Sequence, residues 1–292
     1  MRNHCPVCDR DHEAMICPDC GFDHSLHYEA FPTLVSVVQV RKSVSVLRRE
    51  RSYVGVMHLP DGTYTGEITG GKPHGMGTMR MTNGNVYEGC WEHGQRHGYG
   101  KMTFPSGNVY EGQWEKGLRH GWSQVRYADG SIYNGPWRDD KRCGFARMTH
   151  ANGDVYEGWY RDSQYNGEGT YTWINGDVYE GHWENDQRNG YGKMNCGNGA
   201  VYEGSWLDGE RHGQGKMTYA TGNVYEGRWE NDRRTGQGQM TFHHGGVYKG
   251  TFEVDEKDVL TGGVGQYYKD GAIYHAELRD GKLIRKSLIS KG

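Results

Sequence analysis

A tyrosine recurs every 23 residues through most of this chain. Nine tyrosines keep this spacing and a tenth follows after 26 residues: Tyr64, Tyr87, Tyr110, Tyr133, Tyr156, Tyr179, Tyr202, Tyr225, Tyr248 and then Tyr274. An unbroken period of this length predicts a stack of short structural units, each burying surface only against its neighbours. Because such arrays present one extended surface, the period favours a binding role over catalysis.

The composition supports an ordered repeat array. Glycine is abundant with 47 residues, and the aromatic residues include 21 Tyr and 9 Trp. Disorder requires high net charge and few aromatics, whereas the formal net charge here is only -3. The near-neutral balance makes nucleic-acid binding unlikely. Since there is neither a long apolar run nor a signal-like N-terminus, we expect a cytoplasmic protein whose cysteines are thiols or metal ligands.

Each period reads as one β-hairpin. In the unit 84–106, alternation places Tyr87, Gly89 and Trp91 on one face of a strand. Residues 93–96 are the expected turn, and 98–104 are the expected returning strand. Successive hairpins would add to one antiparallel sheet, stabilised by cross-strand aromatic pairs.

The N-terminus carries two pairs of cysteines. Their spacing is CxxC in both pairs, and the four residues are Cys5, Cys8, Cys17 and Cys20. Two such pairs can place four thiolates tetrahedrally around one Zn²⁺, and the CPxC…CPxCG form resembles the zinc-ribbon family. A four-thiolate site leaves no open coordination position, so we expect a structural zinc. Redox-active or free thiols are the alternative.

Residues 23–52 differ in style from the rest of the chain. Between Leu34 and Leu47, apolar residues recur every three or four positions, which favours a helix, although the many β-branched residues leave a strand pair as the competitor. The end of the segment is basic, with Arg41, Lys42, Arg48, Arg49 and Arg51. This cluster is either a solvated, dipole-stabilised helix end or a contact for an anionic membrane.

The recurring YEGxWxxGxxHGxG pattern resembles the MORN repeat family. Residues 110–121 carry it from Tyr110-Glu111-Gly112 to His120-Gly121. The resemblance implies an all-β fold: an elongated, single-layer antiparallel sheet of stacked hairpins that serves as a protein-binding scaffold. The expected organisation is a zinc ribbon over 1–22, a helical linker or N-terminal cap over 23–52, and the repeat array with a C-terminal cap over 53–292.

The pattern changes near the middle of the array. Ser123 and Ala146 stand where glycine is usual, and additional aromatic and basic residues gather there. One interpretation is repeat drift with compensating packing; the other is a binding patch with aromatic and arginine anchors. The candidate partner-binding residues are Trp122, Tyr127, Phe145, Trp159 and Trp173, with Arg126 and Arg142 at the rim.

The favoured function is a non-catalytic, protein-binding scaffold or accessory subunit that uses a groove of the repeat sheet. The alternative is a tether to anionic phospholipid. An enzyme is less favoured, because the sequence has no P-loop, GxSxG or HExxH motif. No catalytic residues are assigned, and zinc is the only expected cofactor.

Overall fold

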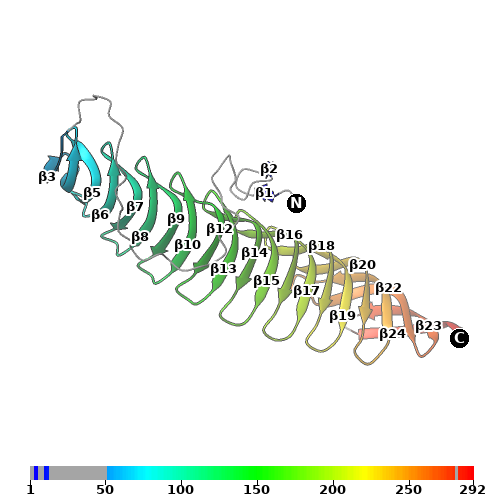
Figure 1. The fold of residues 1–292 in the computed structure, drawn as a ribbon. Coiled ribbons are helices and arrows are strands. Elements are labelled where there is room, and N and C mark those ends of the chain that lie inside the picture. The colour runs from blue at the N-terminus through cyan, green and yellow to red at the C-terminus, as the bar shows by residue number, and fades with distance from the viewer. Residues whose placement is uncertain (1–2, 6–9, 13–50, 280–281) are drawn as a thin grey trace. The chain divides into compact units, whose positions relative to one another are not determined.

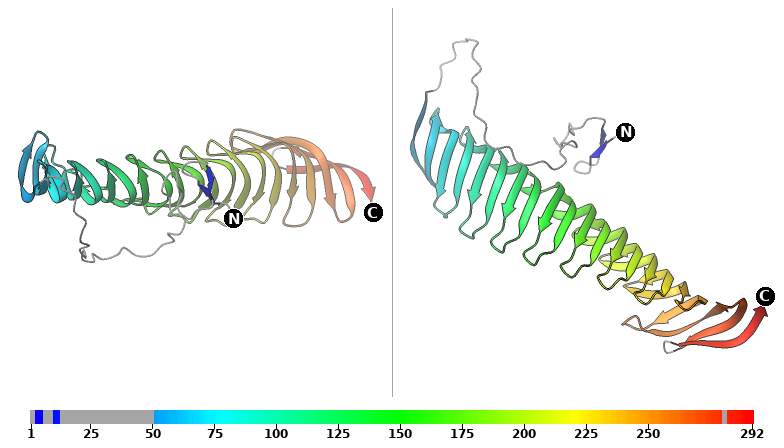
Figure 2. Two further views of the ribbon diagram at one scale, coloured as in Figure 1. Left: turned by 45° about the horizontal axis from the view of Figure 1, so that its top comes forward. Right: turned by 60° about the horizontal axis from the view of Figure 1, so that its bottom comes forward.

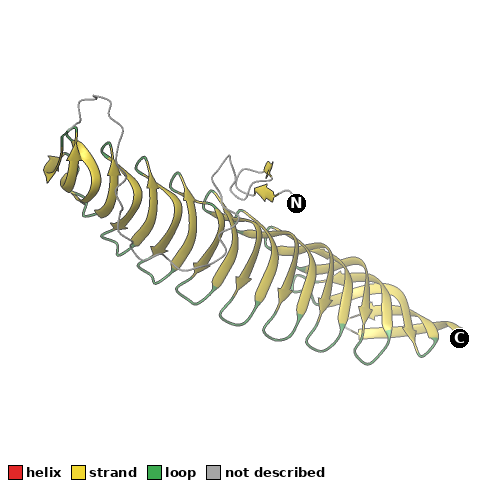
Figure 3. Ribbon diagram, in the orientation of Figure 1, coloured by secondary structure: helices red, strands yellow, loops and turns green. Residues whose placement is uncertain are grey.

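The computed structural model describes residues 3–5, 10–12, 51–279 and 282–292. This part of the chain is all-β and contains no helix (Figure 3). Strands β3 to β24 are 22 strands of an open antiparallel sheet. β1 (Asn3–Cys5) and β2 (Arg10–His12) form a separate antiparallel pair. Residues 23–50 of the segment expected to be helical lie outside the described residues.

The sheet residues divide into two compact units, the first covering 1–146 and 161–163 and the second covering 147–160 and 164–292. Neighbouring strands of the first unit are antiparallel and adjacent in sequence (Figure 1). Its strands are β3 (Ser52–Leu59), β4 (Gly62–Thr69), β5 (Lys72–Met81), β6 (Val86–Glu92), β7 (Gln95–Thr103), β8 (Val109–Glu115), β9 (Leu118–Arg126), β10 (Ile132–Arg138) and β11 (Lys141–Arg142). Strand β12 (Gly144–Thr149) contains the unit boundary.

The second unit repeats the same arrangement, and its strands lie side by side in both views of Figure 2. They are β13 (Val155–Arg161), β14 (Gln164–Thr172), β15 (Val178–Glu184), β16 (Gln187–Asn195), β17 (Val201–Leu207), β18 (Glu210–Thr218), β19 (Val224–Glu230), β20 (Arg233–Thr241), β21 (Val247–Val254), β22 (Leu260–Lys269), β23 (Ala272–Arg279) and β24 (Lys282–Lys291). The end of the chain, expected to be a cap, is thus built from further strands of the sheet.

The turn of most hairpins is tighter than the sequence suggested, the exception being the five-residue turn between β21 and β22. Between β6 and β7 only His93 and Gly94 lie outside the strands, and both have positive φ, 50° and 86°. This is the backbone of a hairpin turn whose twist matches that of the strands. The expected turn over 93–96 was therefore wrong at Gln95 and Arg96, which begin the returning strand.

A β-bulge follows the turn on the returning strand. Gly89 pairs with Gly100 and Trp91 pairs with Arg96. One residue of β6, Cys90, therefore lies opposite residues 97–99 of β7. Gly98, inside the bulge, has φ 64°, a conformation that glycine adopts without steric cost. The bulge changes which residues of β7 share a face with Trp91, and this decides the composition of the two faces.

One face carries the core, a ladder of aromatic rings. The Tyr87 ring is fully buried and lies 5.1 Å from Trp91 and 5.3 Å from Trp114, edge to face with both. Its hydroxyl donates to the carbonyl of Cys90 at 2.9 Å, so the buried polar atom is satisfied. Arg96 covers the Trp114 ring at 4.5 Å and donates to the carbonyl of Gly117. We call this the ladder face.

The ladder changes at the start of the second unit. Tyr160 stands at the position that tryptophan occupies in other repeats, and Tyr165 replaces the arginine. Tyr165 stacks on Tyr156 with ring centroids 3.7 Å apart. This repeat therefore has aromatic stacking where its neighbours have an arginine over a ring, and the tyrosine of the period is still fully buried.

Candidate functional site

The opposite face, called the second face here, presents a row of large apolar side chains in the first unit. Four of them lie twelve residues after a repeat tyrosine. The fifth, Val54 on β3, pairs with Glu67 of β4 and holds the equivalent position of its strand. Each is between 44% and 76% exposed. We call this row the apolar stripe; its members are Val54, Met76, Tyr99, Trp122 and Phe145.

The strand pairing explains why these residues form a row. Met76 pairs with Cys90, Tyr99 with Gln113, and Trp122 with Pro136. The stripe residues therefore sit on every second strand, with a smaller or polar residue on the strand between. Cys90 contacts Met76 directly, sulfur to sulfur at 3.4 Å. Consecutive members of the stripe are therefore separated by one strand, which contributes Cys90, Gln113 or Pro136 to the same row.

The second unit lacks this row. Its residues at the same position in the next four repeats are Glu168, Tyr191, Gln214 and Gln237. Only Tyr191 is aromatic, and its hydroxyl donates to Glu203 at 2.9 Å. Large exposed apolar side chains in consecutive repeats are thus a property of the first unit and not of the repeat pattern.

Tyr99 lies at the centre of the stripe and carries a polar tip. Its hydroxyl donates to Oε1 of Glu111 at 3.1 Å. Partial burial and this hydrogen bond raise the pKa of Tyr99 to about 12. The hydroxyl therefore stays protonated at neutral pH, and the ring presents an uncharged apolar surface.

The structure separates the residues predicted to bind a partner. Trp122 and Phe145 belong to the stripe, and Arg126 lies on the same face, its guanidinium 4.0 Å from Glu111. Trp159 lies on β13, three residues after Tyr156, and so lies on the second face. It belongs to the second unit. Arg142 lies 5.7 Å from the Tyr133 ring and is part of the ladder.

Two of the predicted residues lie toward the ladder side. The ring of Trp173 is 4.5 Å from that of Tyr171, a residue whose ring contacts the ladder tryptophan Trp183. Tyr127 occupies the equivalent position two repeats earlier. The second-face residues of the first unit (Trp122, Arg126 and Phe145) are thus the part of the prediction that the structure brings onto one face.

Sequence reasoning missed Val54, Met76 and Tyr99. The facing of Met76 and Tyr99 depends on the two-residue turn and on the bulge after it, because each shifts the alternation of the returning strand. The facing of Val54 follows from its pairing with Glu67 on β4. The signal that could have found them is the column of positions twelve residues after each tyrosine. Read as a column, it is apolar in successive early repeats and polar in most later ones.

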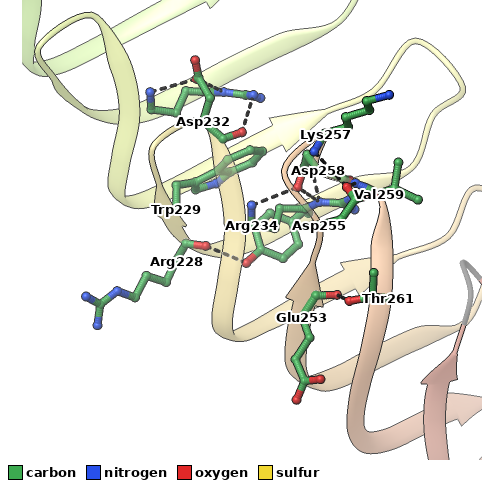
Figure 4. A network of polar contacts seen from close by, with 12 residues as sticks. Arg228, Trp229, Asp232, Arg234, Glu253, Asp255, Lys257, Asp258, Val259 and Thr261 are labelled. Atoms are coloured by element: carbon green, nitrogen blue, oxygen red, sulfur yellow. Dashed lines mark hydrogen bonds and ion pairs between the residues drawn. The ribbon is translucent and has the colours of Figure 1, made fainter.

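Adjacent hairpins are linked on the turn side by arginine and aspartate (Figure 4). Arg234 donates from Nε to Asp258 at 3.1 Å, and its backbone N–H donates to the same carboxylate at 3.0 Å. The side chain of Asp255 accepts the N–H groups of Val259 and Lys257, which lowers its pKa. The acidic turn 255–259 is therefore held by hydrogen bonds within itself and to Arg234 of the preceding hairpin.

The predicted zinc site is only partly covered by the described residues. Cys5 ends β1, and β2 begins at Arg10. Cys8, Cys17 and Cys20 lie outside the described residues, as does the side chain of Cys5. Within the part of the chain that is described, no group of three His, Cys, Asp or Glu side chains is placed to hold a metal ion.

Most of the predicted membrane-contact residues are also undescribed. Arg51 is exposed just before β3, while Arg41, Lys42, Arg48 and Arg49 lie outside the described residues. The described ranges contain no helix that is long and apolar enough to cross a membrane.

Comparison with solved structures finds, among other chains, three of low similarity. The TCP10 domain of Danio rerio CPAP is 14% identical, with a TM-score of 0.39, and the match covers 74% of this chain and 99% of that one. The TCP domain of Drosophila melanogaster SAS-4 (dCPAP), solved in complex with a proline-rich motif of Ana2 (dSTIL), is 11% identical with a TM-score of 0.26, covering 74% and 97%. A streptogramin B lyase structure has a TM-score of 0.16 at 10% identity, covering 82% and 74%. Scores this low carry no inference on function.

Comparison with curated proteins finds no match. The family model described as MORN repeat matches eight segments that together make up more than half of the chain. The matched segments are 64–86, 87–109, 110–121, 133–155, 156–178, 179–201, 202–224 and 225–247. Each matched segment begins at a repeat tyrosine, the residue whose ring forms the ladder. The chain therefore belongs to the MORN-repeat family.

Proposed function

We propose that this protein is a non-catalytic, protein-binding scaffold whose interface is the apolar stripe. The observation that carries the proposal is the run of exposed apolar residues on one face of the first unit. Large aromatic side chains bury on the order of 150–250 Å² each, so five half-exposed side chains present roughly 500 Å². An apolar area of this size is comparable to the largest apolar patch of a typical monomer, and such a patch often serves as an interaction site.

The surroundings of the stripe suit a protein interface. Tyr and Trp are the residues that most often dominate binding energy, and both stand at the centre of this row. Polar and charged side chains flank them on the same face, among them Lys101, Glu111 and Arg126. An apolar centre with a polar rim is the usual anatomy of a protein–protein contact.

The test is capture of a partner by the full chain and by a Tyr99→Ala, Trp122→Ala double variant. Loss of two aromatic anchors should weaken binding by about 2 kcal/mol or more, near 30-fold. Tyr191→Ala is the matched control, since Tyr191 is an exposed tyrosine at the same repeat position with the same hydrogen bond to a glutamate. Cross-links from the partner should map to β5, β7 and β9.

Equal capture by the double variant and the control would contradict the proposal. Flotation with anionic vesicles separates it from the membrane alternative, which predicts binding that depends on the basic residues before β3 and not on Tyr99 or Trp122.

We also propose a structural zinc held by Cys5, Cys8, Cys17 and Cys20. The proposal is supported by the spacing of the two CxxC pairs in the sequence, the first of which begins at the end of β1. Protein purified without chelator should contain one zinc per chain by elemental analysis, and Cys17→Ser should lose it. Retention of stoichiometric zinc by that variant would exclude this ligand set.

A further inference from the structure

We propose that the ligand of the apolar stripe is a polyproline II segment with an apolar side chain at every third residue. This inference rests on the proposed function, because it names the conformation of the partner that the same surface would bind.

The spacing of the stripe comes from the sheet. From Val54 on β3 to Phe145 on β12 the row crosses eight strand-to-strand steps, through β10 to β12. At about 4.8 Å per step, consecutive stripe residues are ~9.6 Å apart and the row spans ~38 Å. A ligand that contacts every member must therefore repeat its apolar side chains at nearly this interval.

Polyproline II matches this interval. It has three residues per turn and a rise of ~3.1 Å, so every third side chain lies on one side at ~9.3 Å. Over four repeats the accumulated mismatch is ~1 Å. In a helix with an apolar residue every seven positions the interval is ~10.5 Å, which accumulates ~4 Å over the same span. The helix loses register with the outer members of the stripe, whereas the polyproline II segment does not.

The surface also offers what such a backbone needs. A polyproline II segment has no internal hydrogen bonds, so its carbonyls seek donors. The indole N–H of Trp122 donates to nothing within the described ranges, and Lys101 lies exposed on the adjacent row of the second face. Flat aromatic rings beside donor groups are the recognition chemistry of proline-rich segments in general.

A strip of backbone lies next to the stripe on the second face. In every hairpin two glycines or small residues separate the stripe from the neighbouring row of charged residues, as Gly89 and Gly100 do between Tyr99 and Lys101. These positions face the ladder side, where a Cβ on Gly100 would meet the ring of Tyr87, so the second face presents backbone between the two rows. In the second unit the equivalent strip, floored by Gly215, Gly227, Gly238 and Gly250, forms a groove of about 650 Å³.

The experiment measures binding of labelled peptides to the full chain by fluorescence anisotropy. The probe is a peptide of about five Leu-Pro-Pro repeats, long enough to follow the stripe. A peptide of Leu-Pro-Pro-Pro repeats keeps the conformation but spaces leucine at ~12.4 Å. A peptide of Leu-Gly-Ser repeats keeps the period of three but is flexible, and an amphipathic heptad peptide presents the helical alternative.

We expect the Leu-Pro-Pro probe to bind at least ~10-fold more tightly than each of the other three peptides. Trp122→Ala and Tyr99→Ala should each weaken it ~10-fold, the size expected for an interface anchor. Tyr191→Ala should change it by less than ~2-fold. Circular dichroism and melting temperature confirm folding of the variants, whose substituted side chains are half exposed on the face away from the ladder.

Equal binding of the Leu-Pro-Pro-Pro peptide, or tighter binding of the heptad peptide, overturns the proposal. If no peptide binds while protein capture remains sensitive to Tyr99 and Trp122, this inference fails and the scaffold function stands. If capture itself is insensitive to those residues, the scaffold interface fails as well.

Discussion

At the scale of single residues, the hairpins depend on the fit between a tyrosine ring and the backbone beneath it. A Cβ on Gly89 would overlap the Cα of Gly100 and lie 2.7 Å from the carbonyl oxygen of Tyr99, both backbone atoms. A Cβ on Gly100 would instead meet the ring of Tyr87. Two later repeats carry a small side chain at the second position, Ser123 and Ala146, whereas at the first position glycine is replaced only in the last hairpin, by Ala276. The two glycines therefore serve different purposes.

This difference predicts unequal costs for two similar substitutions. Gly89→Ala should destabilise the protein by ~3 kcal/mol, because the paired backbone cannot move away. Gly100→Ala should cost ~1 kcal/mol, since a ring can tilt as it must over Ser123 and Ala146. Chemical denaturation of both variants measures the difference. Equal costs would show that the ring, and not the strand approach, limits both positions.

A second residue-scale prediction concerns Asp140, whose carboxylate accepts from Nε of Arg119 at 2.8 Å and from its backbone N–H at 3.0 Å. Partial burial raises the pKa of Asp140, but the hydrogen bonds from Arg119 outweigh it and the pKa is lowered below 3.8. A carboxyl whose pKa is depressed on folding adds stability above its unfolded pKa and loses it as the pH falls through the folded value.

Asp140→Asn should therefore reduce the free energy of unfolding by ~0.5–1 kcal/mol near neutral pH, a modest effect because the carboxylate is partly solvent-screened. The deficit should shrink as the pH falls below 3.8. Asp208→Asn is the control, since Asp208 is an exposed turn residue in another hairpin. Denaturation at several pH values measures both. If the loss in free energy of unfolding does not vary with pH, it comes from lost hydrogen bonds and not from the charge of Asp140.

At the scale of the element, the turn sets the register of each hairpin. Several turns place a non-glycine residue first with positive φ, as His93 does at 50° and Asn185 does at 50°. Asparagine tolerates this conformation better than most residues, and β-branched residues are strongly disfavoured there. The identity of this residue should therefore affect stability although its side chain contributes little to the core.

His93→Asn should stabilise the protein by ~0.5 kcal/mol and His93→Val should destabilise it by ~1–2 kcal/mol. Gln95→Val, one step inside the strand, serves as the control and should be neutral or slightly stabilising. Thermal denaturation of the three variants gives the order. If valine is tolerated equally at both positions, the turn does not have the conformation described.

At the scale of the whole molecule, the period is the property that neighbouring hairpins share. Four hairpins place the repeat tyrosine between their own tryptophan and the next one. Tyr179, for example, lies 5.2 Å from Trp183 and 5.3 Å from Trp206. Since these contacts repeat with the period, a length of chain equal to one period can be removed without changing the pairs that form.

Deletion of residues 177–199 should give a folded protein that retains its β-sheet circular dichroism and unfolds cooperatively. Deletion of about half that length in the same place should not, because the strands would lose both their pairing and the alternation of faces. Melting curves of the two deletions decide. Equal tolerance would show that neighbouring hairpins do not depend on a common register.

The sequence by itself determined the repeat, the hairpin and the inward face of each first strand, because a period of 23 and an alternation of two are local properties of the chain. Tyr87, Gly89 and Trp91 were placed correctly for that reason. It did not determine the facing of the returning strand, which depends on a bulge that forms only when two strands pair. Tertiary structure therefore decided that Val54, Met76 and Tyr99 share a face with Trp122, and that Arg142 covers a ladder ring instead of rimming an interface.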